Sequence, residues 1–349
     1  MDIKKNVLFL YSEIGPYNLP VFMELVNRFD CNVHVVRWDK NCLKPYTPKP
    51  TVGVTYYNRS EYDEVSLDKL LKAISPVIIY VSGWMDKLYL KCSLKIKKTG
   101  VPVVSGFDDI WLGSFRQKLG KYYFKFFLHK YFSHAWVAGE CQFEFARQLG
   151  FPKEKIIFDL LSADVKVFDK SNYVGFGGDF LYVGNFKTVK GTHVLIEAFI
   201  HYKNSLNGQC GLTCIGNGEL KDDLLLVDGI TVVDYMEQIE LIEMVSQSIA
   251  FILPSTHDQW GVVVHEFASA GMPLILSSGV GSSTKFLIDG LNGFSFENGS
   301  FEELAMKMKM FESLDVCKRI MMSEHSKLLS KRVSPTTSAA NFISIVRAI

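Results

Sequence analysis

Two carboxylates lie eight positions apart around the start of an expected helix, Asp258 in a polar loop and Glu266 within the helix. Between them, the backbone N–H groups of Trp260, Gly261 and Val262 open the helix, and such a helix end favours an anion. Hydroxyl groups suit the carboxylates and a phosphate suits the helix end, so the spacing fits a nucleotide sugar. For either acid taken alone, an ordinary helix N-terminus with surface acids is the alternative.

The apolar pattern around these acids predicts the elements that position them. Residues 250–253 form an apolar run typical of a buried strand, residues 261–270 have helical spacing, and residues 274–276 are a second apolar run. Gly271 and Pro273 mark the end of the helix. The polar loop then follows the carboxyl end of a parallel strand, where open α/β sheets bind ligands.

Three features together closely resemble the donor site of the retaining GT-B glycosyltransferases of family 4. They are the two acids at this spacing, the segment Ala-x-Ala-Gly-x-Pro at 268–273 and the segment Asp-Gly-x-Asn-Gly at 289–293. The resemblance implies that Glu266 binds the nucleotide ribose and that Asp258 takes the position of an acid that binds sugar hydroxyls. That acid is usually glutamate in the family, and the shorter Asp258 bears on which sugar is bound.

A second strand-loop-helix pattern, at 180–191, resembles the family's Gly-Arg-loop-Lys-Gly element, whose cations bind the donor diphosphate. The resemblance puts Lys190 in the lysine position and Asn185 in the arginine position, with Lys187 as a partial substitute for the missing cation. A fixed cation matters there because the diphosphate leaves with additional negative charge. Lys190 as an ordinary surface lysine is the alternative.

Three glycines are expected beside ligands. Gly216 and Gly218 follow the apolar run at 212–215 and resemble the family's Gly-x-Gly segment, which implies that they border the nucleotide. Gly15 lies in the first strand-to-helix loop, where it either lets the backbone approach donor or acceptor or is only a turn glycine. The GxGxxG fingerprint is absent around Gly15, so a nicotinamide dinucleotide is not expected.

Asp108 and Asp109 follow a strand expected at 101–104 and are the candidates for the acceptor side of the reaction. Family members often carry a histidine segment near this position, and this chain has the two acids instead. One of them is expected to contact or deprotonate the acceptor hydroxyl, or else to cap a helix that begins near Trp111. Adjacent side chains diverge on an extended chain, so a metal pair is the weaker interpretation.

Residues 115–132 combine basic and aromatic side chains at helical spacing. Lys118, Lys121, Lys125 and His129 fall on one face of the expected helix, and aromatic residues cover much of the rest. Such a helix binds an anionic membrane surface, at about 1 kcal/mol per basic residue, or else packs on the protein with its lysines in solvent. No recognition motif accompanies the charge, so nucleic acid is not expected as a partner.

The composition limits the remaining possibilities. The chain has 349 residues and is 48% hydrophobic, which suffices for two domains. No apolar run approaches the ~20 residues of a membrane span and no signal peptide is evident, so a cytoplasmic protein, at most peripheral on the inner membrane face, is expected. Seven scattered cysteines indicate free thiols. Residues 1–160 carry 23 basic and 16 acidic residues against 15 and 21 in the remainder, so the amino half is the candidate polyanion-binding surface.

Apolar strands alternate with helical stretches along the whole chain, which predicts an α/β protein with mostly parallel sheets. With the resemblance, this pattern predicts a GT-B fold, two Rossmann-like doubly wound domains facing a central cleft. The expected parts are an acceptor-binding domain at 1–162, a polar linker at 163–178 and a nucleotide-sugar-binding domain at 179–334. A final helix at 335–349 is expected to pack back on the amino-terminal domain.

The resemblance implies transfer of a sugar, with retention of configuration, from a UDP- or GDP-sugar to a hydroxyl of a glycan or lipid-linked glycan, as in cell-surface polysaccharide synthesis. Such donor sites typically need no metal, so neither metal nor cofactor is expected, and His257 and His265 are interpreted as structural. A nucleotide-sugar epimerase of the same fold is one alternative. A catalytically silent subunit that binds a membrane or partner is another, supported by the missing arginine and the shorter Asp258.

Overall fold

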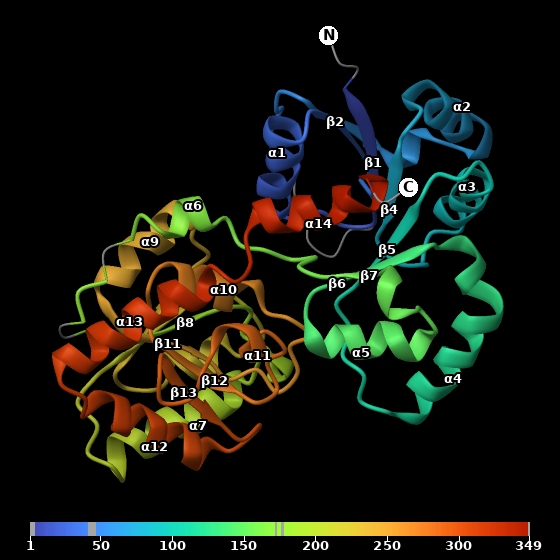
Figure 1. The fold of residues 1–349 in the computed structure, drawn as a ribbon. Helices are drawn as coiled ribbons and strands as arrows, with labels where there is room; N and C mark the ends of the chain where they lie inside the picture. The colour runs from blue at the N-terminus through green and yellow to red at the C-terminus, as the bar shows by residue number, and fades with distance from the viewer. Residues whose placement is uncertain (1–3, 41–46, 172, 176–177, 348–349) are drawn as a thin grey trace. The chain divides into compact units, whose positions relative to one another are not determined.

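The computed structural model describes residues 4–40, 47–171, 173–175 and 178–347. The chain divides into two compact units, the first formed by Met1–Ser162 with Val333–Ile349 and the second by Ala163–Arg332. Each unit is a parallel sheet with helices packed on it (Figure 1). Within the described residues, no helix is both long and apolar enough to cross a membrane.

The first unit is built on a seven-stranded parallel sheet with the order β3-β2-β1-β4-β5-β6-β7. The order reverses between β1 and β4, as in doubly wound sheets, and Val7 pairs there with Ile78. Its central strands are continuous apolar runs because helices cover both faces (Figure 1). The strands are β1 (Lys5–Tyr11), β2 (Cys31–Arg37), β3 (Val54–Asn58), β4 (Ile78–Val81), β5 (Val103–Phe107), β6 (His134–Val137) and β7 (Ile156–Ile157).

Side-chain caps begin several helices of the first unit. Asp86 accepts hydrogen bonds from the backbone N–H groups of Leu88 and Tyr89, and Asp63 forms a capping box with Ser66. The helices are α1 (Asn18–Arg28), α2 (Glu64–Ile74), α3 (Lys87–Lys97), α4 (Phe115–Tyr123), α5 (Glu140–Leu149) and α14 (Pro335–Arg347).

The last helix, α14, packs on α1 within the first unit. Phe342 is fully buried, and the centroid of its ring lies 5.0 Å from that of Phe9 on β1 and 5.0 Å from that of Trp136 on β6. Asn341 donates a hydrogen bond of 3.1 Å to the carbonyl oxygen of Phe158. The apolar face of this helix therefore completes the core of a unit whose other elements lie more than 170 residues earlier.

Residues 115–132 do not form the single helix that their spacing predicts. The α-helix α4 ends at Tyr123, a π-helical turn runs over Phe124–Leu128, and a short 3-10 turn follows at His129–Tyr131. The π turn changes the helical spacing after Tyr123, and the basic residues of the segment differ in their exposure. Lys121 is half-buried and bonds Gln148, whereas Lys118 and Lys125 are exposed.

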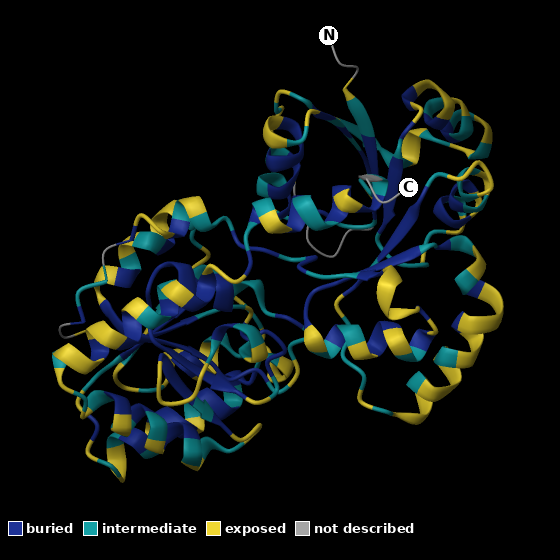
Figure 2. Cartoon of the chain, in the orientation of Figure 1, coloured by how far each residue is buried: buried dark blue, intermediate teal, exposed yellow. Residues whose placement is uncertain are grey.

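The second unit is built on a six-stranded parallel sheet with the order β10-β9-β8-β11-β12-β13. The order reverses between β8 and β11, so this sheet is also doubly wound. Apart from the edge strand β10, which has no buried residue, the strands are buried along most of their length (Figure 2). They are β8 (Asp179–Val183), β9 (Leu212–Ile215), β10 (Ile230–Val233), β11 (Ser248–Leu253), β12 (Leu274–Ser277) and β13 (Gly293–Phe296).

Residues 163–178, expected to be a linker, belong to the second unit and contain the short helix α6 (Val165–Phe168). Phe168 is fully buried, and its ring centroid lies 6.2 Å from that of Phe267 on α10. One apolar anchor thus holds a stretch whose polar composition suggested a linker. The helices of this unit are α6, α7 (Thr192–Asn204), α8 (Lys221–Leu225), α9 (Gln238–Ser246), α10 (Val262–Ser269), α11 (Ser283–Phe286), α12 (Phe301–Glu312) and α13 (Val316–Ser330).

Both parallel sheets and their reversal points agree with the doubly wound α/β architecture expected from the alternating pattern. The prediction of two Rossmann-like domains is therefore confirmed. Elements expected around the acids also form, since β11 and β12 flank α10 in the predicted order. Because all strands of the second sheet are parallel, the loops that follow β8, β9, β11 and β12 share one edge of that sheet.

Candidate functional site

The loops after β8 and β11 bring a cation and a carboxylate together at the carboxyl edge of the second sheet. The Lys190 Nζ lies 2.7 Å from the Asp258 Oδ2, and the side chains are 30% and 11% exposed, respectively. Ser255 also donates a weaker bond of 3.5 Å to the same carboxylate oxygen. A partly desolvated pair of this kind is stronger than one in open water. The structure thus places two of the expected site residues in direct contact.

The backbone of Asp258 is fixed by the neighbouring loop after β12. Its N–H donates to the carbonyl oxygen of Gly279 at 3.0 Å, and its carbonyl oxygen accepts from the N–H of Gly281 at 2.8 Å. These two bonds continue the pairing of the sheet beyond the end of β11. The carboxylate therefore sits on a rigid support, as a group that positions a ligand requires.

Helix α10 opens directly after this carboxylate. Gly261 is the residue before the helix and has a φ of 80°, in the left-handed region that favours glycine. Ser282 holds the turn, donating from its backbone N–H to the carbonyl oxygen of Trp260 at 2.9 Å and from its hydroxyl to that of Gly261 at 3.2 Å. The N–H group of Val264 donates to the carbonyl oxygen of Gly261 at 3.1 Å, so the N–H groups of Val262 and Val263 before it provide an anion site next to Lys190.

The side chain of Trp260 is buried in the protein and does not lie at the exposed start of the helix. It is buried, and the centroid of its ring lies 6.0 Å from that of Phe286 in an edge-to-face arrangement. Its indole nitrogen has no hydrogen-bond partner among the described residues. The side chain therefore braces the loop, and only its backbone can contribute to the anion site.

Glu266 lies on α10, about one turn beyond the helix start, and is half-buried. Gln238, the first residue of α9, donates a hydrogen bond of 2.9 Å to the Glu266 Oε1. Burial raises the pKa of the Glu266 carboxyl to about 7, the bond from Gln238 opposes this rise, and the charge of Asp164 adds to it. A carboxyl group with a pKa this far above 4.5 is typical of a functional site.

Gln238 is a site residue that the sequence did not single out. It begins the helix that follows β10, so it reaches the same edge of the sheet as the loops after β8 and β11. A polar residue at the start of a helix after a parallel strand is the signal that could have found it. Its contact with Glu266 could not be read from the sequence, because 28 residues separate the two.

The remaining donor-side candidates lie on the same edge, but two of them are exposed to solvent. Asn185 and Lys187 are exposed in the loop after β8, the loop from which Lys190 forms its ion pair with Asp258. The carbonyl oxygen of Asn185 accepts a hydrogen bond of 3.1 Å from the hydroxyl of Tyr182. The backbone of this loop is thus tied to β8 while the Asn185 side chain remains accessible.

Gly216 and Gly218 have a packing reason to be glycine. A Cβ atom at Gly216 would overlap the carbonyl oxygen of Gly184, and one at Gly218 would overlap that of Phe186. The φ angles of 142° and 159° are also rare for other residues. The loops after β8 and β9 therefore touch through their backbones, which accounts for both glycines whether or not a nucleotide lies beside them.

Gly15, Asp108 and Asp109 belong to the first unit and follow β1 and β5 at the carboxyl edge of its sheet. The N–H of Gly15 donates to the Asn18 side chain at 2.8 Å, and its φ lies outside the positive range, so no backbone strain requires glycine there. Asp108 is exposed and Asp109 is half-buried. Burial, and next the charge of Asp108, raise the pKa of Tyr17.

The expected alternative for the two aspartates, a helix cap, is wrong. The helix near Trp111 begins only at Phe115, and its cap is Ser114, whose hydroxyl accepts from the backbone N–H of Gln117. Neither Asp108 nor Asp109 occupies that position, because several irregular residues separate them from the helix. A contact with an acceptor hydroxyl is therefore the interpretation that stays open for them.

His265 has a structural position. It is fully buried, its Nδ1 accepts from the backbone N–H of Ala163 at 3.0 Å, and its Nε2 lies 3.0 Å from the carbonyl oxygen of Ser330, to which it donates. Its ring stacks on Phe286 with 4.3 Å between the centroids. Among the described residues, no group of three or more histidine, cysteine or acidic side chains could hold a metal ion.

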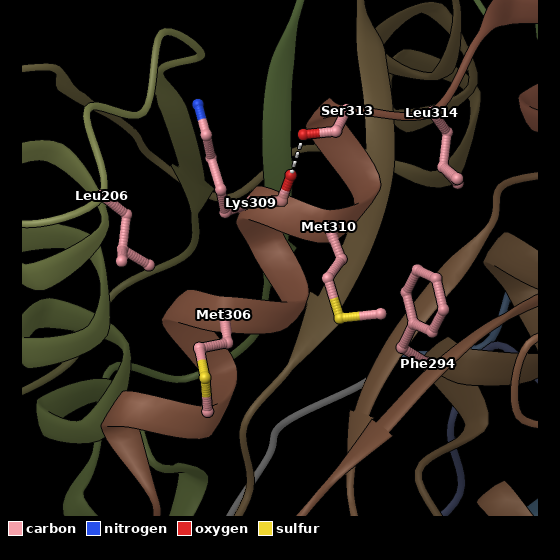
Figure 3. Close-up of a pocket in the computed structure, with 7 residues that line it drawn as sticks. All are labelled: Leu206, Phe294, Met306, Lys309, Met310, Ser313 and Leu314. Carbon is pink, nitrogen blue, oxygen red and sulfur yellow. Dashed lines mark hydrogen bonds between the residues drawn. The ribbon is translucent and has the colours of Figure 1, made fainter.

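A pocket of about 470 Å³ lies elsewhere in the second unit. Figure 3 shows Met310 of α12 beside Phe294 of β13, with Met306 of α12 nearer to Leu206, which follows α7. Its lining is almost entirely apolar, and none of the lining residues belongs to the loops that carry Lys190 or Asp258. It therefore lacks the polar groups that a nucleotide sugar requires.

Known proteins resemble both the sequence and the fold. Residues 169–328 match the family described as glycosyl transferases group 1. Two glycogen synthases of Mycobacterium tuberculosis strains are 30% identical over 124 residues, a match that spans 34% of this chain and only 30% of their length. The matched family region includes Lys190, Asp258 and Glu266.

Solved structures resemble the whole chain at low identity, which supports the fold alone. The Anabaena protein HepE, solved with UDP, has a TM-score of 0.75 and 14% identity over 99% of this chain and 100% of that one. A glycosyltransferase from Rickettsia africae has a TM-score of 0.74 and 14% identity over 99% and 98%. A sucrose-phosphate synthase from Thermosynechococcus elongatus has a TM-score of 0.73 and 13% identity over 99% of each chain. The chain therefore has the GT-B fold, and the region that matches the glycosyl transferases group 1 family lies within its second unit.

Proposed function

We propose that the protein is a retaining glycosyltransferase of family 4, which moves a sugar from a nucleotide-sugar donor to a hydroxyl of a glycan or lipid-linked glycan. The observation that carries this proposal is the Lys190–Asp258 ion pair of 2.7 Å beside the N-terminus of α10, with Glu266 one turn further along. A cation, an anion-binding helix end and two carboxylates in this order match a diphosphate between a sugar and a ribose.

Each residue has a role in this proposal. Lys190 and the N–H groups that begin α10 bind the diphosphate and stabilise the charge that develops on it as it leaves. Asp258 accepts hydrogen bonds from sugar hydroxyls, and Glu266 accepts them from the ribose. A nucleoside diphosphate is a good leaving group, so the site needs no strong acid to protonate it, unlike a glycosidase.

The ion pair changes partners when the donor binds. Lys190 then shares its charge between Asp258 and the diphosphate, which leaves the carboxylate oriented by Ser255 and by the backbone bonds to Gly279 and Gly281. The fixed backbone lets the short Asp258 side chain point at one hydroxyl position of the sugar. Gly216 and Gly218 allow the neighbouring backbone of the second unit to border the nucleotide.

Further observations bear on the identity of the two substrates. HepE was solved with UDP and with UDP-glucose, which favours a UDP-sugar over a GDP-sugar as the donor. On the acceptor side, we assign the contact with the accepting hydroxyl to Asp108 or Asp109, since both follow β5 at the edge of the first sheet. Cell-surface polysaccharide synthesis in the cytoplasm, at the inner membrane face, is the setting that we propose.

One observation favours a second candidate, a catalytically silent subunit. Asn185 occupies the position where the family carries an arginine, and its exposed side chain supplies no charge to the diphosphate. A protein of this kind would bind a nucleotide weakly and release no product. A nucleotide-sugar epimerase would instead turn over the donor without any acceptor.

The test is a thermal-shift panel of UDP-, GDP-, ADP- and TDP-sugars on the wild type, on Lys190→Ala and on the matched exposed lysine variant Lys331→Ala. A specific donor at about 100 times its Kd stabilises the protein by about 2.7 kcal/mol. We expect one nucleotide to stabilise the wild type and Lys331→Ala, and Lys190→Ala to lose this effect. Release of nucleoside diphosphate only when an acceptor glycan is added then identifies a transferase, and binding without release identifies the silent subunit.

A further inference from the structure

Helix α4 lacks the buried face that normally holds a short helix in place. None of its nine residues is buried, although it is amphipathic in sequence. Isolated helices shorter than about 12–15 residues are marginal in water, and tertiary packing of an apolar face supplies most helix stability in proteins. Figure 2 shows α4 exposed along its length. Within the described residues, nothing covers its apolar side.

Large apolar side chains are concentrated on this exposed segment. Phe115 is 77% exposed and Phe126 is 71% exposed, values that are unusual for phenylalanine. Two neighbouring rings, Tyr123 and Phe127, pack on each other with centroids 5.2 Å apart and remain exposed together. Contiguous apolar patches of this kind mark sites that contact another molecule or a membrane.

The exposed rings of the π-helical turn lie between two buried anchors. Phe124 and Leu128 are buried and anchor the turn to the core of the first unit. Phe126 and Phe127, which lie between them, are thereby turned to solvent next to Tyr123. The exposed rings are therefore built on a rigid base.

The charged side chains of this segment are all of one sign. Between Asp109 and Glu140 the chain contains five lysine and arginine residues and no acidic residue. One of them, Lys121, is held by Gln148, whereas Arg116, Lys118, Lys125 and Lys130 are exposed. Exposed rings surrounded by cations, without any acid, are typical of segments that lie in the interface of an anionic membrane.

We propose that the first unit docks on an anionic lipid bilayer through a docking face formed by these side chains. Its apolar members insert among the acyl chains near the headgroups, and its basic members bind the headgroup phosphates. The apolar members are Phe115, Leu119, Tyr122, Tyr123, Phe126 and Phe127. The basic members are Arg116, Lys118, Lys125 and Lys130.

The charge pattern selects a bilayer over a second copy of this chain. In a symmetric dimer the docking face would meet itself, and its four exposed cations would face four more without a compensating acid. An anionic bilayer satisfies both properties at once, because it offers negative charge at the surface and an apolar phase directly below it. The inference goes beyond the proposed transfer reaction, since it needs neither the donor nor Lys190.

Vesicle binding tests the proposal. Full-length protein is mixed with vesicles of phosphatidylglycerol and phosphatidylcholine, or of phosphatidylcholine alone, and the bound fraction is measured by flotation at low and high salt. We expect binding to the anionic vesicles that falls as salt rises. Each basic residue contributes roughly fivefold to partitioning, so Arg116→Gln/Lys118→Gln/Lys125→Gln lowers it on the order of a hundredfold. The matched variant Lys69→Gln/Lys98→Gln/Lys153→Gln, at exposed lysines of the same unit, lowers it far less.

The apolar part of the docking face has its own pair of variants. Phe115→Ser/Phe126→Ser lowers partitioning at least about tenfold, whereas Val65→Ser/Met85→Ser, at exposed apolar positions of the same unit, leaves it unchanged. Thermal unfolding verifies that each variant folds. The proposal is overturned if wild-type protein ignores anionic vesicles, or if the docking-face variants bind like their controls. It is also overturned if the serine variants still bind the vesicles and soluble heparin displaces the protein fully, because the face would then bind any polyanion. Loss of a dimer in the serine variants would likewise overturn it, because the face would then join two copies of the chain.

Discussion

Gln238 and Glu266 are joined by a hydrogen bond of 2.9 Å between the first residue of α9 and the second turn of α10. The bond gives one oxygen of the Glu266 carboxyl a fixed donor. Burial raises the pKa of that carboxyl to about 7 even though the bond opposes the rise. The proton of Glu266 is therefore exchanged near neutral pH, and Gln238 is the neighbour that limits how tightly it is held.

The raised pKa of Glu266 predicts a pH dependence of stability. The folded protein holds this proton more tightly than the unfolded chain, so the contribution is complete below the ordinary pKa of 4.5 and is lost as the pH rises through about 7. Glu266→Gln keeps an acceptor for Gln238 but removes the titration. We expect the variant to be more stable than the wild type at about pH 8 by roughly 1–3 kcal/mol, and similar to it at about pH 5.

Denaturant unfolding at the two pH values measures this difference. Glu324→Gln, at an exposed glutamate on α13, is the matched control and should follow the wild type at both. An equal stability difference at the two pH values would mean that Glu266 does not titrate in this range.

We expect the substitution Gln238→Ala to shift the pH dependence of nucleotide binding. If the ribose binds the ionised Glu266, affinity for the nucleotide rises about tenfold between roughly pH 6 and pH 8, as the ionised fraction grows. Removing the bond from Gln238 removes the interaction that lowers the pKa of Glu266, so the midpoint of this rise moves to higher pH. Titration calorimetry across this range measures the midpoint.

A structural defect alone would lower nucleotide affinity equally at all pH values, whereas a changed pKa of Glu266 would move the midpoint. The midpoint therefore separates these two explanations. Gln247→Ala, just beyond the other end of α9, provides the control and should leave the midpoint unchanged. A midpoint that stays in place in Gln238→Ala would show that the bond does not tune Glu266.

Much of the second unit could be predicted because its strands are continuous apolar runs followed by polar loops. That pattern located β11, α10 and β12, and parallel order then placed Lys190 and Asp258 on one edge of a sheet. What the pattern leaves open is the direct ion pair, since the side-chain contact depends on how two loops 68 residues apart approach each other. The contact of Gln238 with Glu266 was unpredicted for the same reason.

The predictions that differ from the structure depend on single buried residues within polar or amphipathic stretches. Phe168 anchors α6 in a segment whose overall composition is that of a linker. Phe124 and Leu128 are four positions apart, as in an ordinary helix, yet they anchor a π turn, which spacing alone does not distinguish. Local composition does not reveal such tertiary anchors.

We expect the substitution Asp258→Asn to strengthen nucleotide binding and to weaken sugar transfer. Without the carboxylate, Lys190 is no longer shared, so its full charge serves the diphosphate and UDP binds a few-fold more tightly. The amide accepts a sugar hydroxyl less well than a carboxylate, so kcat/KM falls about ten- to a hundredfold. Calorimetry with UDP and a product-release assay with the identified donor measure the two effects.

The control for this prediction is Asp234→Asn, which breaks an exposed ion pair with Lys221 in the same unit. It should change neither quantity, because a surface pair contributes little. If Asp258→Asn weakens UDP and transfer alike, the ion pair holds the loops together rather than competing with the diphosphate.

We expect the substitution Asn185→Arg to strengthen UDP binding. Asn185 is exposed in the loop after β8, and only its backbone oxygen is used by Tyr182, so an arginine side chain fits without displacing a packed residue. A guanidinium at this position adds a charge-assisted contact with the diphosphate, for which we expect about three- to tenfold tighter UDP binding. The matched variant Asn204→Arg adds the same charge at the exposed end of α7 and should leave affinity unchanged.

Tighter UDP binding by both Asn185→Arg and Asn204→Arg would mean that only the net charge of the protein matters. Tighter binding by Asn185→Arg together with faster transfer would show that the chain is an active enzyme whose phosphate site lacks one cation, whereas tighter binding without any transfer would favour the silent subunit.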